Sequence, residues 1–87
     1  FHRGFFLKVT QNNQNIQMEI YYEDYALKDI REVFDKYGID IHSMKVENLK
    51  NKSMFLEMET YVNKGFQKES LVEEMMNKTY FKMLNYY

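Results

Sequence analysis

Residues 27–46 read LKDIREVFDKYGIDIHSMKV, and this stretch decides the fold. Apolar side chains recur first at the spacing of one helix face, at Leu27, Ile30, Val33, Phe34 and Tyr37. Gly38 follows the last apolar turn, where a helix ends in the left-handed conformation that glycine adopts most easily. Ile39 and Ile41 then alternate with polar residues, as in a half-buried strand, and a change of phase near Ser43 predicts a bend or bulge. The stretch therefore predicts a helix, a glycine stop and a strand.

Working outward, residues 15–22 and 54–62 alternate apolar and polar side chains with a period of two, which predicts two more strands. Asp24 precedes the first helix and is expected to cap it. The polar run at 11–15 (QNNQN) is typical of a turn, and residues 49–53 predict a hairpin loop.

A second, shorter amphipathic helix is predicted over residues 68–77, with Leu71, Val72, Met75 and Met76 as its apolar residues. Residues 80–87 predict a last strand with Phe81 and Met83 facing inward. The alternative is a continuation of the helix, because Met76, Tyr80 and Met83 also fit helical spacing.

The predicted order is strand, helix, strand, strand, helix, strand. This order consists of two strand–helix–strand halves. Right-handed crossovers interleave the two halves into one four-stranded antiparallel sheet with both helices on one face. The predicted fold class is therefore α+β, a ferredoxin-like βαββαβ domain with strand order fourth, first, third, second. Its open face would carry rings and carboxylates on the central strands, with Lys45 and Lys82 on the flanking strands beside them.

The chain of 87 residues is the length of one domain, and its net charge of −1 argues against a protein built to hold nucleic acid. It has no cysteine, which excludes thiolate chemistry and fits a reducing compartment. We assign residues 14–87 to the domain. Residues 1–13 are either an extra N-terminal element packed on it or a connector cut from a preceding membrane segment, because the chain begins at Phe1.

The sequence offers little reactive chemistry. His42 and Asp40 could form a weak metal pair, but a structural histidine is the simpler interpretation, since zinc sites need three or four ligands. The acidic pairs, such as Glu57 and Glu59, are read as a solvated face. The chain lacks a nucleophile elbow and a phosphate loop, so we expect no enzyme, no metal and no cofactor. RNA binding on the open face would set phosphates against Glu19 and both of those glutamates.

The helix, the run KYGIDIHSMKVE and the strand MFLEMETYV resemble an ACT-type regulatory domain, in which Gly38 is followed by the pair Ile39 and Ile41. Within that group, YALKDIREVFDKYGIDIHSMKVE most resembles the cytoplasmic C-terminal domain of the MgtC/SapB membrane protein family. The resemblance implies an ACT-like regulatory or assembly domain on the cytoplasmic side of the cell membrane, linked to magnesium homeostasis.

Two places on the chain are candidate sites. Amino-acid-binding ACT domains carry a glycine-containing turn after the first strand, and here that position holds Glu23, Asp24, Tyr25 and Ala26, which are poor donors for a ligand carboxylate. The other place is an unpaired edge strand, with interface candidates Ile41, Ser43, Lys45, Tyr80, Lys82 and Tyr86. We expect self-association or pairing with a membrane-domain partner; the alternative is a sensor of a small ligand, an amino acid or a nucleotide.

Overall fold

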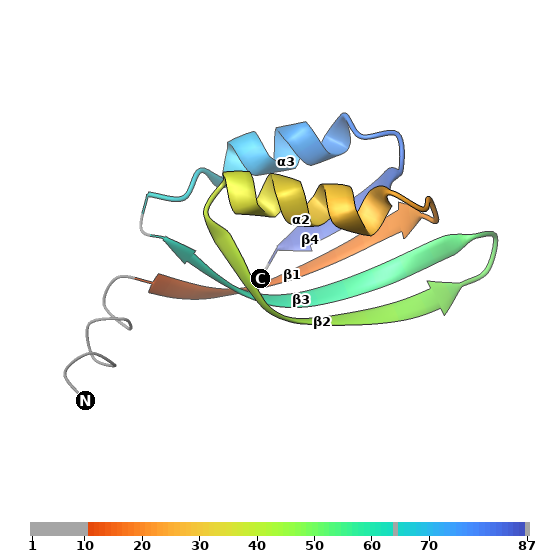
Figure 1. Ribbon diagram of the computed structural model, residues 1–87, viewed down its shortest axis with the longest axis horizontal. Helices are drawn as coiled ribbons and strands as arrows, with labels where there is room; N and C mark the ends of the chain where they lie inside the picture. Colours follow the sequence, from red (N-terminus) through yellow and green to blue (C-terminus); the bar gives the residue numbers. More distant parts are fainter. Residues whose placement is uncertain (1–10, 64, 87) are drawn as a thin grey trace.

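The computed structural model describes residues 11–63 and 65–86, which form one sheet and two helices. The strands are β1 (Gln11–Tyr21), β2 (Ile39–Leu49), β3 (Ser53–Asn63) and β4 (Phe81–Tyr86). The helices are α2 (Ala26–Lys36) and α3 (Lys68–Met76), and both lie on the same side of the sheet (Figure 1). This is the predicted βαββαβ order, and it confirms the final segment as a strand.

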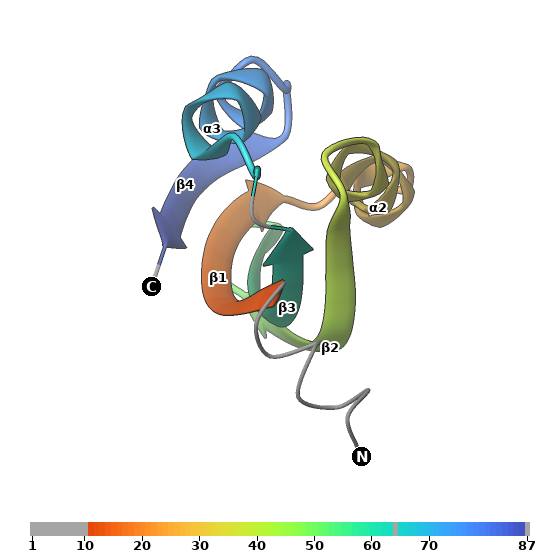
Figure 2. The same ribbon diagram turned by 90° about the vertical axis from the view of Figure 1, so that its left-hand side faces the viewer.

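All strand pairs are antiparallel, and the order across the sheet is β2-β3-β1-β4. The two central strands pair over their whole length, from Gln11 opposite Asn63 to Tyr21 opposite Ser53. The predicted strand order is therefore confirmed. Helix α2 packs next to β2 and α3 next to β4, so each helix covers one half of the same face of the twisted sheet (Figure 2).

The core is a single layer between the sheet and the helices. Every element but β4 contributes buried side chains to it. Those of β1 and β3 follow the two-residue period predicted from the sequence. The buried side chains are Ile16, Met18, Ile20, Ala26, Ile30, Val33, Phe34, Ile39, Met54, Leu56, Met58, Val62, Leu71, Met75 and Tyr80. Because strands bury alternate residues, the remaining side chains of β1 and β3 form an open face, which neither of the described helices covers.

Gly38 ends α2 as predicted. Its φ is +74°, and its N–H donates to the carbonyl of Asp35 at 3.0 Å. A β-carbon at this position would lie 3.3 Å from the side-chain amide of Asn63, so the position is also crowded. Glycine meets both the backbone and the packing requirement here.

The bulge predicted near Ser43 is present. The pairing of β2 with β3 shifts between Ile41 and Ser43, so His42 is an extra residue in β2. The same kind of shift occurs in β4, where Ile20 pairs with Phe81 but Glu19 pairs with Met83. Both edge strands of the sheet are therefore interrupted by a bulge.

Three local predictions were wrong. The QNNQN run is not a turn but the first half of β1, which pairs with the end of β3. Asp24 does not cap α2: the N-cap residue is Tyr25, and no side chain caps that end. Met83 does not face inward, because the bulge in β4 leaves it 43% exposed and brings Leu84 onto the core beside Phe81.

Candidate functional site

The turn between β1 and α2 is the first candidate site, and it is filled by aromatic contacts. Glu23, Asp24 and Tyr25 are exposed, whereas Ala26 is buried under the helix. The Tyr25 hydroxyl lies 2.9 Å from the hydroxyl of Thr79, and its ring meets that of Tyr80 edge to face at 5.9 Å. Carboxylates and a ring surround this turn, so it presents acceptors and apolar surface to a ligand.

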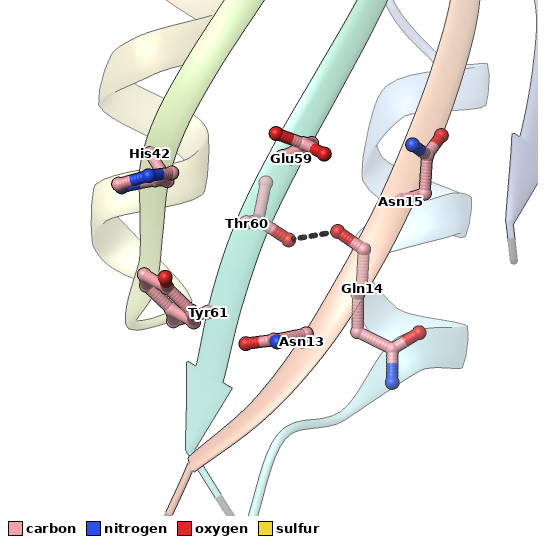
Figure 3. Close-up of a pocket in the computed structure, with 7 residues that line it drawn as sticks. All are labelled: Asn13, Gln14, Asn15, His42, Glu59, Thr60 and Tyr61. Atoms are coloured by element: carbon pink, nitrogen blue, oxygen red, sulfur yellow. Dashed lines mark hydrogen bonds between the residues drawn. The ribbon is translucent and has the colours of Figure 1, made fainter. Parts of the chain in front are cut away.

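A second candidate place is the open face at the bulge of β2. There the ring of His42 lies 5.2 Å from that of Tyr61 (Figure 3). Next to it, Ser43 donates to the Glu59 carboxylate at 3.1 Å. Across β3, the side-chain oxygen of Asn15 is buried and lacks a hydrogen-bond partner. A buried acceptor without a partner is costly, and it is usually satisfied by water or a ligand.

These residues line a hollow of about 440 Å³, half open to solvent, together with Asn13, Gln14 and Thr60. Thr60 is already satisfied, since its hydroxyl donates to the Gln14 carbonyl at 3.0 Å. The hollow therefore presents a carboxylate, side-chain amides with both donors and acceptors, and two rings. These groups suit a polar ligand that both donates and accepts hydrogen bonds.

The described part of the chain holds no group of three or more His, Cys, Asp or Glu side chains placed to bind a metal ion. On the open face, most carboxylates have protein partners instead. Glu19 forms an ion pair with Lys82 at 2.9 Å, and Glu57 accepts from Gln17 at 3.4 Å. Lys82 also donates to Ser53 at 3.0 Å and lies over the ring of Tyr21.

On the helix-covered face of the sheet, a polar bridge connects the two helices. Lys36 of α2 contacts Glu74 of α3 at 2.7 Å, and the Tyr37 hydroxyl donates to the same carboxylate at 2.8 Å. The hydrogen bond from Lys36, followed by that from Tyr37, lowers the pKa of Glu74. The same contact raises the pKa of Lys36.

Beside this bridge, the buried Tyr80 donates to the Asp29 carboxylate at 2.5 Å, and Lys78 contacts that carboxylate at 2.9 Å. The hydrogen bond from Tyr80, reinforced by Lys78, lowers the pKa of Asp29. Burial and the Asp29 hydrogen bond raise the pKa of Tyr80 well above its usual value. Sequence reasoning missed this cluster, since its members are far apart in the chain; Asp29 and Glu74 looked like any other residues of the exposed helix faces.

The predicted interface residues divide between the two edges. Ile41, Ser43 and Lys45 lie on β2, and Lys82 lies on β4. Tyr80 is only 1% exposed, so its side chain is part of the core rather than of an open edge. Tyr86 pairs with Ile16 through its backbone, and its side chain lies outside the described residues.

The arrangement of elements places the chain among ACT-like βαββαβ domains. A formyltetrahydrofolate deformylase from Pseudomonas putida KT2440 matches 87% of this chain with a TM-score of 0.74 and 4% identity. This chain spans 28% of that protein, so the likeness concerns one domain of a longer chain.

The C-terminal domain of the MgtC protein from Mycobacterium tuberculosis has the same fold, with a TM-score of 0.71 and 14% identity. The match covers 90% of this chain and 86% of that domain, so the two correspond almost from end to end. The resemblance to MgtC seen in the sequence is thus confirmed at the level of the fold. No model of a protein family matches the sequence, and no curated protein does.

Among the described residues, neither helix has the length and apolar character needed to cross a membrane.

Proposed function

We propose that this chain is a non-catalytic regulatory or assembly domain of an MgtC/SapB-type membrane protein, on the cytoplasmic side of the membrane. In this role it would associate with a second copy or with the membrane domain and so regulate the activity or assembly of the parent protein. The parent protein would have a part in magnesium homeostasis. The end-to-end fold match with the MgtC C-terminal domain supports this assignment, because a whole domain corresponds rather than a fragment.

The observation that carries the role in association is the pair of open sheet edges. β2 and β4 each pair with one strand only, so their outer backbone groups have no strand partner within the described chain. Such edges are templates for another strand. The β2–β3 hairpin extends past the helices (Figure 1), which leaves Val46 and Leu49 exposed to 46% and 37%.

The proposal that the domain is not an enzyme is supported by the state of its carboxylates. Glu19, Glu57 and Glu59 are each engaged by a neighbouring side chain, and the hollow beside Glu59 is half open to solvent. Acid or base catalysis needs a carboxylate placed to meet a substrate in a water-excluding cleft.

Sedimentation velocity of the chain over a range of concentrations tests the proposed association. We expect the sedimentation coefficient to rise with concentration and to approach that of a dimer. A chain that stays monomeric at millimolar concentration, alone and when mixed with the membrane part of the parent protein, would contradict the proposed function.

The second candidate function is the sensing of a small ligand, which the unpartnered Asn15 oxygen in the hollow favours. NMR titration with amino acids and nucleotides tests it. Shifts confined to Asn13, Asn15, His42 and Tyr61 would support a sensor at the hollow, and shifts at residues 23–26 would place a ligand at the turn instead. A spectrum that does not change with any of these compounds up to millimolar concentration would contradict the sensor.

A further inference from the structure

The end of the sheet at the β2–β3 hairpin gathers exposed apolar side chains. Leu49 is 37% exposed, and Tyr21 and Tyr22 are 48% and 55% exposed. Leu49 and Tyr21 lie in one row across the sheet, because both pair with Ser53 of β3, and Tyr22 directly follows β1. Single exposed apolar residues are normal on a protein surface, whereas a group of adjoining ones points to a binding surface.

The hairpin loop is fixed to this group by hydrogen bonds. The N–H of Tyr22 donates to the carbonyl of Lys52 at 2.7 Å, which joins the loop to the end of β1. Lys82 lies over the ring of Tyr21, 4.9 Å from its centre, and donates to the hydroxyl of Ser53. The surface is therefore formed before a partner arrives, so that little ordering is needed on binding.

The loop also carries lysines whose charge the described chain leaves free. Lys50 and Lys52 are exposed, and within residues 11–63 and 65–86 neither forms an ion pair. Lys52 has a φ of +56°, a backbone conformation that glycine or asparagine adopts more easily. A residue held in such a conformation is often functional, and here the charge of the lysine gives it a role.

We propose that this hairpin end, made by Tyr21, Tyr22, Leu49, Lys50 and Lys52, binds the surface of a bilayer that contains anionic phospholipid. The leucine and the two rings would enter the interfacial layer, where tyrosine is enriched, and the lysines would meet lipid phosphates. The inference rests on the proposed function only in placing a membrane within reach, and it goes beyond that function by naming lipid as a direct partner.

The shape of the domain suits this contact. The hairpin extends past both helices, so it reaches a flat surface first (Figure 1). Its loop, residues 50–52, contains no carboxylate. Glu23 and Asp24 lie in the turn that leads to α2, and Glu47 lies back along β2. The contact would use the ends of strands rather than an edge, so β2 and β4 would remain open for association.

A single tryptophan tests the insertion, since the chain has none. With vesicles of equal parts phosphatidylglycerol and phosphatidylcholine, we expect the emission of Leu49→Trp to shift to the blue and to be quenched by brominated lipid. Gln67→Trp is the control, at an exposed, uncharged site before α3. It follows the far end of β3, about 30 Å from the hairpin, so its emission should not change.

Vesicle co-sedimentation of the chain without tryptophan tests the charges. Lys50→Gln/Lys52→Asn should lower the partition coefficient about tenfold or more in low salt, because two attractions to anionic lipid are lost. Asparagine suits the positive φ at residue 52, so the hairpin should keep its fold. Arg31→Gln/Lys45→Gln removes the same charge from exposed sites on α2 and β2. This control should change the coefficient less than about twofold, since those sites lie more than a Debye length from the loop.

The outcomes separate this inference from the proposed function. A native chain that binds neither mixed vesicles nor pure phosphatidylglycerol in low salt would overturn the inference, and its sedimentation alone would still decide self-association. Binding that resists the double lysine substitution, or a Gln67→Trp reporter that shifts as far as Leu49→Trp, would overturn the hairpin as the contact. Loss of self-association in the lysine variant, without vesicle binding by the native chain, would assign this surface to a second copy instead. Vesicle binding by a chain that stays monomeric would contradict the proposed association and support this inference.

Discussion

At the scale of single residues, two positions fix how helix α2 ends and how it is joined to the segment before β4. Gly38 takes a backbone conformation that other residues adopt only with strain, and it does so beside Asn63. Tyr80 brings a buried hydroxyl to Asp29 and joins α2 to the segment before β4. The first was predictable from its place after an apolar helix stripe. The second was not, because a hydrogen bond between residues fifty-one positions apart leaves no local signal.

We expect Gly38→Ala to lower the free energy of unfolding by about 1 kcal/mol, because alanine at a positive φ is strained. Urea denaturation measures the change. Gly65→Ala is the matched control: nothing lies within 4 Å of its β-carbon, and its φ is outside the strained range. That variant should be neutral or slightly more stable, since alanine restricts the unfolded chain. Equal losses in both variants would show that Gly38 is not special.

Tyr80→Phe should cost about 1–2 kcal/mol of stability, because it removes a hydrogen bond to a charged group from a buried site. Lys78 remains beside Asp29 and limits the loss. Tyr25→Phe removes an exposed hydroxyl contact and should change stability by less than about 0.5 kcal/mol. Thermal and urea unfolding of the two variants in parallel check this difference; a Tyr80 variant as stable as the native chain would contradict it.

The two lowered carboxyl pKa values make part of the stability depend on pH in the acid range. The unfolded chain binds protons near the ordinary values of 3.8 for Asp29 and 4.5 for Glu74, whereas the folded chain binds them only at lower pH. The stabilisation is therefore complete above pH 4.5 and is lost as the pH falls through the lowered folded values. We expect Asp29→Asn and Glu74→Gln to flatten the dependence of unfolding on pH below 4.5. A slope that neither substitution changes would assign acid unfolding to other carboxylates.

At the scale of elements, the periodic patterns predicted the type and order of every helix and strand. The errors fall where tertiary pairing overrides local character. The polar start of β1 is a strand because its backbone pairs with the end of β3, whatever its side chains are. In β4, the bulge inserts one extra residue, and a shift of one residue moves every later side chain to the other face of the sheet. Met83 therefore points away from the core instead of toward it.

The edge strand β4 depends on Lys82, which bridges Glu19 and Ser53 and covers Tyr21. We expect Lys82→Met to keep the packing of the stem but to speed hydrogen exchange of the β4 amides relative to those of β3. Lys50→Met, in the exposed hairpin loop, is the control and should leave β4 unchanged. Unchanged exchange in the Lys82 variant would mean that backbone pairing alone holds β4.

At the scale of the whole molecule, residues 11–63 and 65–86 form a sheet with one face covered by helices. Its other face and its two edges are open as far as these residues show. The open face and the edge strands were predictable from alternation and topology. The hollow at the β2 bulge was predictable only in part. The sequence indicates a bulge near Ser43, but it does not show that the resulting shift in register brings His42 next to Tyr61. Identifying which of these surfaces a partner covers would therefore test the proposed function.

Amide hydrogen exchange of the native chain at low and high concentration tests the central proposal, association through an open edge, most directly. We expect protection to rise with concentration at the outward-facing N–H groups of Ser43–Leu49, while amides of α3 and of the central strands keep their rates. Exchange that does not depend on concentration anywhere in the described chain would contradict association through an edge of this sheet.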